Sequence, residues 1–233
     1  MRSLAVVILL VFILGCATTD TFKVTAPEEG WNVPTISNVE VILPEGAAVD
    51  IPVGCFALGP YTQASMKPME LDILNALSTI HRSDHFSNQE PAKIVVLVRS
   101  LVNQYSNNSM YLFGCIAWCI VDGSGDILYQ NQFYILSDGR VFVTPSMVKS
   151  KFNMRTAQQI SNSTIAAFDQ RLEESYAQVN GVYYSFDDVE PILPKTVSSV
   201  YSGPIIGSAT ASTDWHRAVK TDAVDWKQYL RRD

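Results

Sequence analysis

The sequence is poor in the residues from which most catalytic and metal sites are built. Its 233 residues include three histidines and four cysteines. It contains no Gly-x-Ser-x-Gly sequence, no glycine-rich phosphate loop and no Cys-x-x-Cys pair, so the common nucleophile, nucleotide and redox motifs are missing. The neighbouring carboxylates Asp187, Asp188 and Glu190 belong to no pattern that would make them an acid/base pair. We therefore expect a protein that is not an enzyme and that holds no cofactor other than covalent lipid.

Charge of one sign and long apolar runs are also scarce. The formal net charge is −6, and neither acidic nor basic residues gather in blocks. Without a basic stripe to neutralise phosphates, nucleic acid is not an expected partner. The longest apolar run after the N-terminal region extends from Cys115 to Val121. This run is far shorter than the roughly 20 residues that a membrane-spanning helix needs.

The first apolar run has the form of an export signal. Arg2 is the one charge before eleven apolar residues, Leu4 to Leu14, and Gly15 follows them. A short positive start, an apolar stretch too short to span a bilayer and a small residue before a cut site are typical of a secretory signal peptide. A buried N-terminal helix fits less well, because the run has no polar face. Residues 1–15 are therefore expected to be removed after export.

The end of this run, Leu14-Gly15-Cys16, preceded by Ile13 and followed by Ala17, resembles the lipobox of bacterial lipoproteins. The resemblance implies that Cys16 becomes the first mature residue and carries lipid on its thiol and on its new amino group. Two or more acyl chains such as palmitate anchor a protein stably, whereas one chain binds a membrane only marginally. Because Ala17 rather than aspartate follows the cysteine, the resemblance implies the outer membrane, with the protein facing the periplasm. The alternative is an ordinary secretory cut that leaves Cys16 free or paired.

Three further cysteines remain: Cys55, Cys115 and Cys119. An oxidising periplasm permits a disulfide, but an odd number leaves at least one thiol over. Cys115 and Cys119 lie four residues apart in an expected strand, which places their Cα atoms about 13 Å apart, beyond disulfide reach. A bond from Cys55 to one of them is the alternative. Three buried thiols is the favoured interpretation.

Hydrophobic periodicity and turn residues divide the mature chain into strands and helices. Residues 16–38 are expected to form a lipidated N-terminus and a polar tether. Strands are expected over residues 39–43, 53–58, 92–105, 110–121, 127–136 and 141–143. Turns are expected over residues 106–109, 122–126 and 137–139. Helices are expected over residues 65–81 and 146–176.

This order of elements predicts an α+β fold, with an antiparallel sheet and helices packed on one face. The periplasmic domain is expected over residues 39–181. An extended arm rich in proline, serine and threonine follows over residues 182–213, and a terminal helix over residues 214–233. The layout resembles that of small envelope lipoproteins, including auxiliary lipoproteins of envelope lipid transport and assembly. No shared motif accompanies this likeness, so it indicates no family for the mature domain and does not fix a function.

One weak metal candidate occurs at the end of the first expected helix. His81, Asp84 and His85 would place two imidazoles on one face if the helix continued, as zinc ligands often are. The helical pattern ends there, however, and no third ligand beyond Asp84 is evident. An exposed polar helix end is the default interpretation.

Aromatic residues gather on the expected central strands. As a set, Tyr111, Phe113, Trp118, Tyr129 and Phe133 are candidates for a groove that holds an apolar ligand such as a lipid. The alternative is that they form the core and cross-strand pairs of the sheet.

The C-terminal stretch offers a partner-docking candidate. Trp215, Trp226 and Tyr229 lie in an expected helix after the extended arm, where they could contact another protein. Equally, the helix could fold back and cover its own domain. Both arrangements stay open at this point.

These features together favour a membrane-anchored envelope lipoprotein that binds a partner protein or scaffolds an envelope complex without catalysis. Its contact with the membrane would be through the lipid on Cys16. The first alternative is a lipid-binding or lipid-transport accessory that uses the aromatic groove. The second is a hydrolase or metal-binding protein with an unrecognised site.

Overall fold

The computed structural model describes residues 30, 32–50, 61–80, 91–106, 109–140, 145–169, 182–183, 187 and 219–230. The expected signal peptide, Cys16, most of the tether, the strand at 53–58 and the His81–His85 region lie outside these residues. The elements are β1 (Ile36–Ile42), β2 (Ala48–Asp50), the 3-10 helix η1 (Gln63–Met66), α2 (Lys67–Ser78), β3 (Ala92–Ser106), β4 (Ser109–Val121), β5 (Ile127–Arg140), α3 (Pro145–Phe168), β6 (Val182–Tyr183) and α5 (Lys227–Leu230). Among the described residues, no helix is both long and apolar enough to cross a bilayer.

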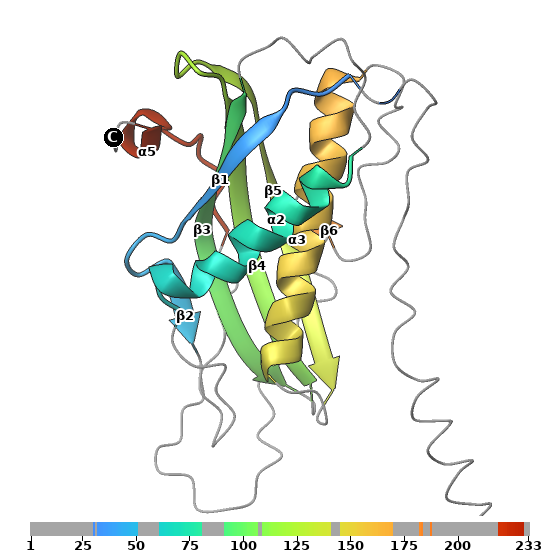
Figure 1. Cartoon of the computed structure of the whole chain (residues 1–233). Helices are drawn as coiled ribbons and strands as arrows, with labels where there is room; N and C mark the ends of the chain where they lie inside the picture. Colours follow the sequence, from blue (N-terminus) through green and yellow to red (C-terminus); the bar gives the residue numbers. More distant parts are fainter. Residues whose placement is uncertain are drawn as a thin grey trace, which may run out of the picture.

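The strands form a six-stranded mixed sheet in the order β1-β3-β4-β5-β6, with β2 also paired to β3 (Figure 1). Strands β3, β4 and β5 form an antiparallel meander, as the turn signals predict. Strands β1 and β2 instead pair parallel with β3. The α+β class is therefore confirmed, but a wholly antiparallel sheet is wrong. The physical reason is α2, which carries the chain across the sheet so that β3 runs in the same direction as β1.

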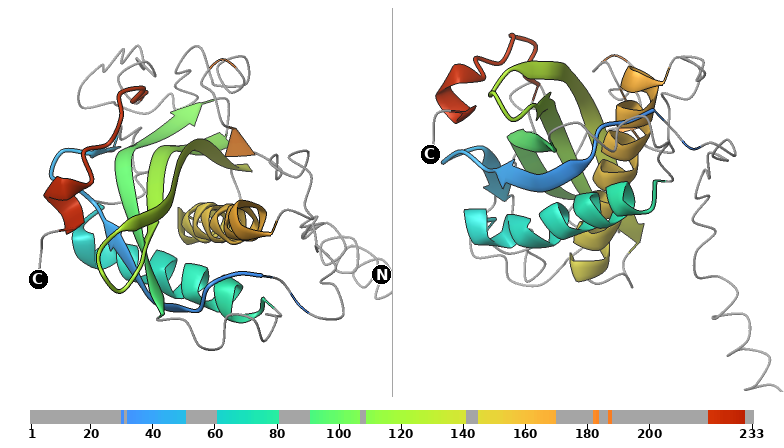
Figure 2. Two further views of the ribbon diagram at one scale, coloured as in Figure 1. Left: turned by 90° about the horizontal axis from the view of Figure 1, so that it is seen from above. Right: turned by 45° about the horizontal axis from the view of Figure 1, so that its top comes forward.

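Helices α2 and α3 pack against one face of the sheet, here called the helix-covered face (Figures 1 and 2). Strand alternation directs every second side chain of the central strands toward these helices. The largest fully buried side chains in this core are Met69, Ile73, Leu77, Ile94, Leu101, Leu112, Ile116, Trp118, Ile120, Phe133 and Phe152. The expectation that the helices lie on one face is confirmed.

Helix α3 packs closely against the sheet at Gly114 of β4. A Cβ atom at Gly114 would lie 2.6 Å from Cζ of Phe152 and 3.4 Å from Cδ1 of Leu101. Both of those side chains are buried, so neither has free space beside it. The glycine is required here because its missing side chain makes the room that the Phe152 ring fills.

Helix α2 begins and ends near its expected bounds. Pro68 lies in the first turn, where its missing N–H leaves no hydrogen bond unmade. Helices η1 and α2 also protect the outer edge of β1: Glu70 Oε1 of α2 accepts from Val41 N at 3.2 Å, and Gln63 Oε1 of η1 accepts from Leu43 N, just after the strand, at 2.8 Å. An edge strand whose main-chain groups are satisfied by side chains is a poor template for pairing with another chain.

Two local expectations in the sheet have different outcomes. The hairpin turn at 122–126 is confirmed: Asp122 Oδ1 accepts from the main-chain N of Ser124 and of Asp126, each at 2.9 Å. The turn at 137–139 is wrong, because β5 continues to Arg140 and stays paired with β4. Ser137 is buried and donates to the carbonyl of Val148 at 3.2 Å. The continuing ladder and this contact override the local turn preference of Ser137-Asp-Gly139.

Three boundaries also differ from expectation. Strand β1 begins at Ile36, within the stretch expected to be tether. Helix α3 ends at Phe168 rather than at Tyr176, and the carboxylate of Asp169 accepts from Asn32 N at 3.0 Å. The terminal helix is wrong for residues 219–226, which are not helical; α5 spans four residues, Lys227–Leu230. The expected arm begins with β6, which pairs with β5, and most of its remainder lies outside the described residues.

Candidate functional site

The face of the sheet opposite α2 and α3 is covered by residues 219–230, here called the C-terminal segment (Figure 2). Alternation along β3 shows the division: Val96 packs toward the helices, whereas Val95 and Leu97 pack with Trp226. We call this second surface the tail-covered face. It brings residues of β1, β3 and β4 into contact with a part of the chain more than a hundred residues away in sequence.

Trp226 anchors the segment. Its side chain is 5% exposed and packs in an apolar cluster, here called the Trp226 seat, which consists of Ile42, Val95, Leu97, Ala117, Cys119 and Val121. Tyr229 lies against Trp226 with ring centroids 6.4 Å apart and planes at 71°, an edge-to-face arrangement. The structure therefore shows the fold-back arrangement for Trp226 and Tyr229, the second of the two that the sequence left open. Trp215 lies outside the described residues.

A polar cluster holds the other end of the segment. The carbonyl oxygen of Lys220 accepts hydrogen bonds from Gln132 Nε2 at 2.6 Å, Tyr134 Oη at 3.2 Å and Arg99 Nη1 at 3.3 Å. Arg99 Nη1 also donates to the carbonyl of Asp222 at 2.7 Å, and Arg99 Nη2 pairs with the Asp222 carboxylate at 2.9 Å. We call Arg99, Gln132 and Tyr134 the carbonyl clamp. These side chains bind mainly main-chain oxygens, so the clamp recognises the path of a chain more than its sequence.

The position of Arg99 follows from an irregularity in β3. Val98 pairs with Ile116 and Ser100 with Cys115, so Arg99 is the extra residue of a β-bulge. The Arg99 side chain is 8% exposed, and its guanidinium also donates to Gln132 Oε1. A buried arginine side chain is tolerated only when its donors are satisfied, and the segment supplies three of the acceptor atoms: the carbonyl oxygens of Lys220 and Asp222 and the Asp222 carboxylate.

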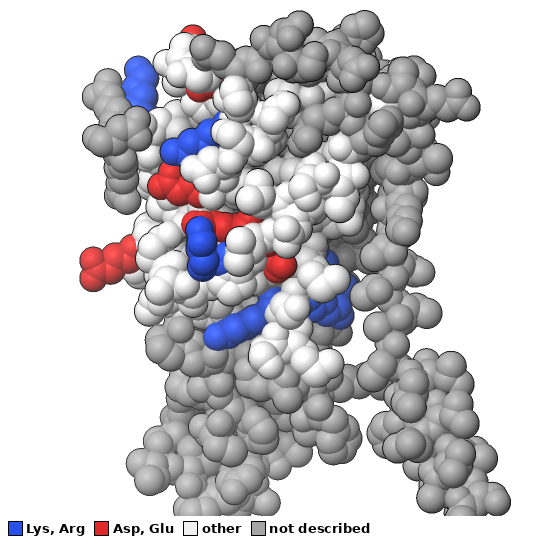
Figure 3. Space-filling view, in the orientation of Figure 1, with Lys and Arg blue, Asp and Glu red and all other residues white. Residues whose placement is uncertain are grey.

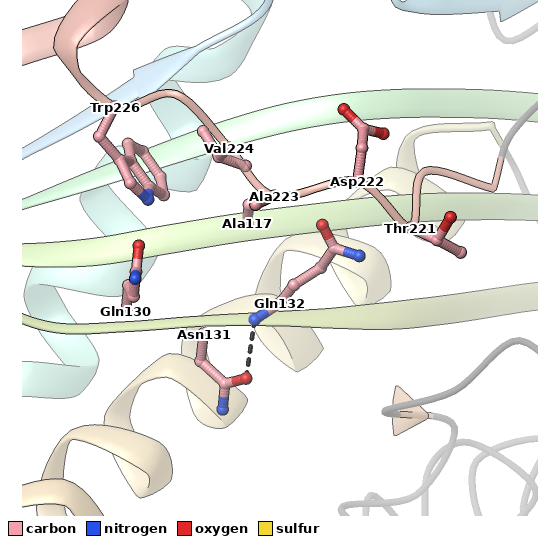
Figure 4. A pocket seen from close by; sticks show the side chains of 9 residues that line it. All are labelled: Ala117, Gln130, Asn131, Gln132, Thr221, Asp222, Ala223, Val224 and Trp226. Atoms are coloured by element: carbon pink, nitrogen blue, oxygen red, sulfur yellow. Dashed lines mark hydrogen bonds between the residues drawn. The ribbon is translucent and has the colours of Figure 1, made fainter.

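A cleft of about 260 Å³ remains between the segment and the sheet (Figure 4). It is lined by Ala117, Gln130, Asn131, Gln132, Thr221, Asp222, Ala223, Val224 and Trp226. Figure 4 shows Gln130 and Gln132 directed toward the segment, while Asn131 points to the other side of β5. The cleft is open to solvent, and Val224 packs against the sheet beside it.

Two free thiols lie beneath the segment. Cys115 and Cys119 are both buried and unpaired, and Cys115 Sγ lies 3.9 Å from the carbonyl oxygen of Lys220. Burial raises the pKa of Cys115 to about 11 and that of Cys119 to about 12. Thiols of this kind are protonated and unreactive at neutral pH. The interpretation as buried thiols is confirmed for these two, whereas Cys55 lies outside the described residues.

The aromatic candidates do not form one groove. Trp118 and Phe133 are buried on the helix-covered face, and Tyr129 packs there with its ring centroid 5.3 Å from that of Trp118. Phe113 is buried on the tail-covered face, where it stacks on Tyr134 at 5.9 Å, and Tyr111 packs against the same cluster. Alternation along β4 separates Phe113 from Trp118. These residues therefore act as core and cross-strand contacts.

The surface in the orientation of Figure 1 shows acidic and basic side chains interspersed, without a large field of one sign (Figure 3). Two of the ion pairs join Lys67 to Glu70 at 2.5 Å and Lys93 to Glu40 at 2.7 Å. Among the described residues, no group of three or more His, Cys, Asp or Glu side chains is placed to hold a metal ion. The metal candidates His81, Asp84 and His85 lie outside those residues.

Sequence reasoning missed the carbonyl clamp. The one available signal was Arg99 itself, a lone charge within the apolar stretch Ile94–Val102. A charged residue in a strand that is covered on both faces must find polar partners inside the protein. Gln132 and Tyr134 gave no comparable signal, because Gln132 lies in the polar run Gln130–Gln132 and Tyr134 in the apolar and aromatic run Phe133–Leu136.

Comparison with known proteins adds little. No protein-family model matches the chain, and no curated protein matches it. Among solved structures it is similar to "a putative lipoprotein from Caulobacter crescentus", with 10% identity and a TM-score of 0.36 over 55% of this chain and 88% of that one. It is also similar to a minor lipoprotein from Acinetobacter baumannii, with 13% identity and a TM-score of 0.34 over 57% and 94% of the two chains. A third structure, of an uncharacterized protein, shows 9% identity and a TM-score of 0.31 over 58% and 95%. Two of these neighbours are described as lipoproteins, but likenesses this weak carry no argument about function.

Proposed function

We propose that this chain is a lipid-anchored lipoprotein of the bacterial envelope, held at the outer membrane and facing the periplasm, and that it works without catalysis by binding a partner protein. The anchor rests on the lipobox-like sequence that ends in Cys16. About twenty residues separate Cys16 from the start of β1 at Ile36. At full extension they reach roughly 70 Å, so the domain can work well away from the membrane surface.

Partner binding rests on one observation: the sheet presents a face that already holds a stretch of polypeptide. The carbonyl clamp binds the main-chain oxygens of Lys220 and Asp222, and the Trp226 seat takes one indole. An apolar pocket for one aromatic anchor beside donors for main-chain oxygens is the chemistry by which proteins recognise extended segments of other proteins. The lipid-binding alternative draws no support from the five aromatic candidates, because they lie on two faces of the sheet.

The anchor is tested on full-length protein isolated from membranes, with Cys16→Ser as the matched control. Mass spectrometry of the N-terminal peptide is expected to show cleavage before Cys16 and acyl chains on that residue. The outer-membrane fraction is expected to contain the protein and to lose it in Cys16→Ser. An unmodified N-terminus, or a cut elsewhere, contradicts the anchor.

Partner binding is tested by site-specific photocrosslinking in intact envelopes. A photoreactive residue at Gln130, which is exposed and lines the cleft, is compared with one at Asn75, which is exposed on α2. We expect one defined protein to crosslink from Gln130 and not from Asn75. Equal capture from both positions, or none from either, contradicts partner binding at this face.

A further inference from the structure

The C-terminal segment is bound to the sheet like a ligand and not like a further strand. Its hydrogen bonds with the sheet run from side chains of β3 and β5 to the main-chain oxygens of Lys220 and Asp222. The segment is absent from the strand order of the sheet. Its only internal helix, α5, has four residues. The attachment therefore consists of the clamp, the seat and the partly buried apolar contacts of Val219, Val224 and Leu230.

One side chain of the segment, Trp226, is buried, whereas Thr221, Asp222 and Ala223 are exposed. Val219, Val224, Tyr229 and Leu230 are partly buried and also pack against the sheet. A binding site that uses main-chain oxygens, one buried indole and partly buried apolar side chains accepts any chain that offers the same groups. Asp222 adds a preference, because its carboxylate pairs with Arg99 while remaining 78% exposed.

The surface between the clamp and the seat is open to solvent. The cleft of about 260 Å³ is a surface hollow, lined on the side of the segment by Thr221, Asp222, Ala223, Val224 and Trp226. Segments with few buried contacts open at lower free energy than the core to which they are attached.

From these observations we propose that the tail-covered face is an exchangeable seat for an extended, tryptophan-bearing segment of a partner protein, and that residues 219–230 occupy it until that partner binds. The partner segment offers two carbonyls at the spacing of Lys220 and Asp222, an acidic side chain at the second position and a tryptophan four residues later. This proposal rests on the proposed function of partner binding and names the chemistry of the partner.

Residues 219–230 compete with any added segment for the same site. Exchange therefore predicts the direction in which a substitution in these residues changes the affinity for an added segment. A ligand that needs an open site binds with an apparent affinity reduced by the fraction of molecules in which the site is open. A tethered competitor acts at an effective concentration of roughly millimolar when its linker is short and flexible. A substitution that weakens the chain's own segment must therefore strengthen binding of an added one. If the segment were itself the partner-binding element, the same substitution would weaken partner binding.

The test uses full-length lipidated protein in detergent and a fluorescent synthetic peptide with the sequence of residues 219–230. Fluorescence anisotropy measures the affinity of this peptide for three proteins: wild type, Trp226→Ala and the double variant Arg99→Met/Trp226→Ala. We expect Trp226→Ala to bind the peptide about tenfold or more tighter than wild type, and the double variant to lose most of that gain. A peptide that carries alanine in place of its tryptophan is expected not to bind.

Equal affinity of wild type and Trp226→Ala for the peptide overturns the exchangeable seat, as does equal binding of the alanine peptide. Trp226→Phe, which keeps an aromatic ring in the seat, is the control for folding and is expected to behave like wild type. If Trp226→Ala forms dimers with wild-type protein, the seat binds a second copy of this chain. That result overturns the proposal that the seat binds a segment of a different protein.

The Gln130 crosslink separates this proposal from the proposed function. If the seat exchanges, Trp226→Ala increases capture of the partner from Gln130 in envelopes. If capture is unchanged while the peptide fails to exchange, partner binding stands and the exchangeable seat is overturned. If capture from Gln130 is absent in wild type and in Trp226→Ala alike, the proposed function itself fails.

Discussion

Replacing Trp226 by alanine should release the C-terminal segment while leaving the rest of the domain folded. Trp226 is 5% exposed, and a tryptophan buries about 200 Å² of surface, so at roughly 25 cal/mol per Å² its transfer from water contributes up to about 5 kcal/mol. The hydrogen bonds of the clamp contribute about 1 kcal/mol each. The Arg99–Asp222 pair adds at most about 1 kcal/mol, because the Asp222 carboxylate is largely exposed. The indole is therefore the largest single contribution.

From these contributions we expect Trp226→Ala to reduce the free energy that keeps the segment closed by about 3 kcal/mol. This loss corresponds to a rise in the open population of about 150-fold. The free energy of global unfolding should change much less, because the core between the sheet and helices α2 and α3 is untouched. A small change in global stability with a large change in local opening is the signature of release.

The two thiols beneath the segment report this opening without any added label. Cys115 lies under the Lys220 carbonyl and Cys119 is part of the Trp226 seat. In the closed state their raised pKa values keep both thiols protonated near pH 8. Alkylation by iodoacetamide therefore requires opening, and site-resolved mass spectrometry gives a rate for each cysteine.

Because alkylation requires the open state, we expect both rates to rise with the open population, about 150-fold, in Trp226→Ala. Met154→Ala, which shortens an exposed side chain on α3, is the control and should leave both rates unchanged. A rise at Cys119 alone would mean that the seat loosens while the clamp holds, which refutes release of the whole segment. Unchanged rates at both sites would refute the energetic reasoning.

Three further predictions concern the clamp, the sheet core and pH. Arg99→Met should raise alkylation of Cys115 at least about tenfold, because Arg99 donates two hydrogen bonds to main-chain oxygens of the segment, at about 1 kcal/mol each; an unchanged rate would show that the clamp does not hold the segment. Gly114→Ala should destabilise the protein by about 1–3 kcal/mol through overpacking against Phe152, lowering Tm by several degrees, and Phe152→Leu in the same chain should recover part of the loss in calorimetry. Raising pH should lower stability between about 9 and 11, since unfolded thiols ionise near 9 whereas folded Cys115 stays protonated to about 11 and Cys119 to about 12. The urea concentration at the unfolding midpoint should fall with pH across that range in wild type, and this pH dependence should become weaker when both cysteines are replaced by alanine.

The antiparallel meander was predictable from sequence because its determinants are local. The apolar run from Ile94, the turn residues Asp122 to Asp126 and the alternation in β5 set each strand within a few residues of its observed bounds. Helix α2 was predictable for the same reason, since Met69, Ile73 and Leu77 recur at helical spacing and are buried. The parallel pairing of β1 and β2 was not predictable, because the strand order is set by where α2 packs and not by any residue within the strands.

Residues 219–226 show how tertiary contacts override a local pattern. Trp215, Val219, Ala223, Trp226 and Leu230 have helical spacing, and that spacing predicts a helix from residue 214. In a helix the carbonyls of Lys220 and Asp222 would each accept from an amide four residues later. In the structure those carbonyls accept from the carbonyl clamp instead. The clamp takes the acceptors that a helix would need, so within residues 219–230 only Lys227–Leu230 are helical.

The same contrast explains why the site could be found only in part from sequence. Aromatic abundance on β4 and β5 pointed to a groove, yet side chains of that kind serve equally as core, and here they lie on both faces of the sheet. Arg99 carried more information, because one charge within an otherwise apolar strand conflicts with its surroundings unless something inside the protein satisfies it. What satisfies it here is a distant piece of main chain, whose position no local pattern records. A charged residue in an otherwise apolar strand, such as Arg99, is therefore a better guide than aromatic abundance to where this sheet holds another stretch of polypeptide.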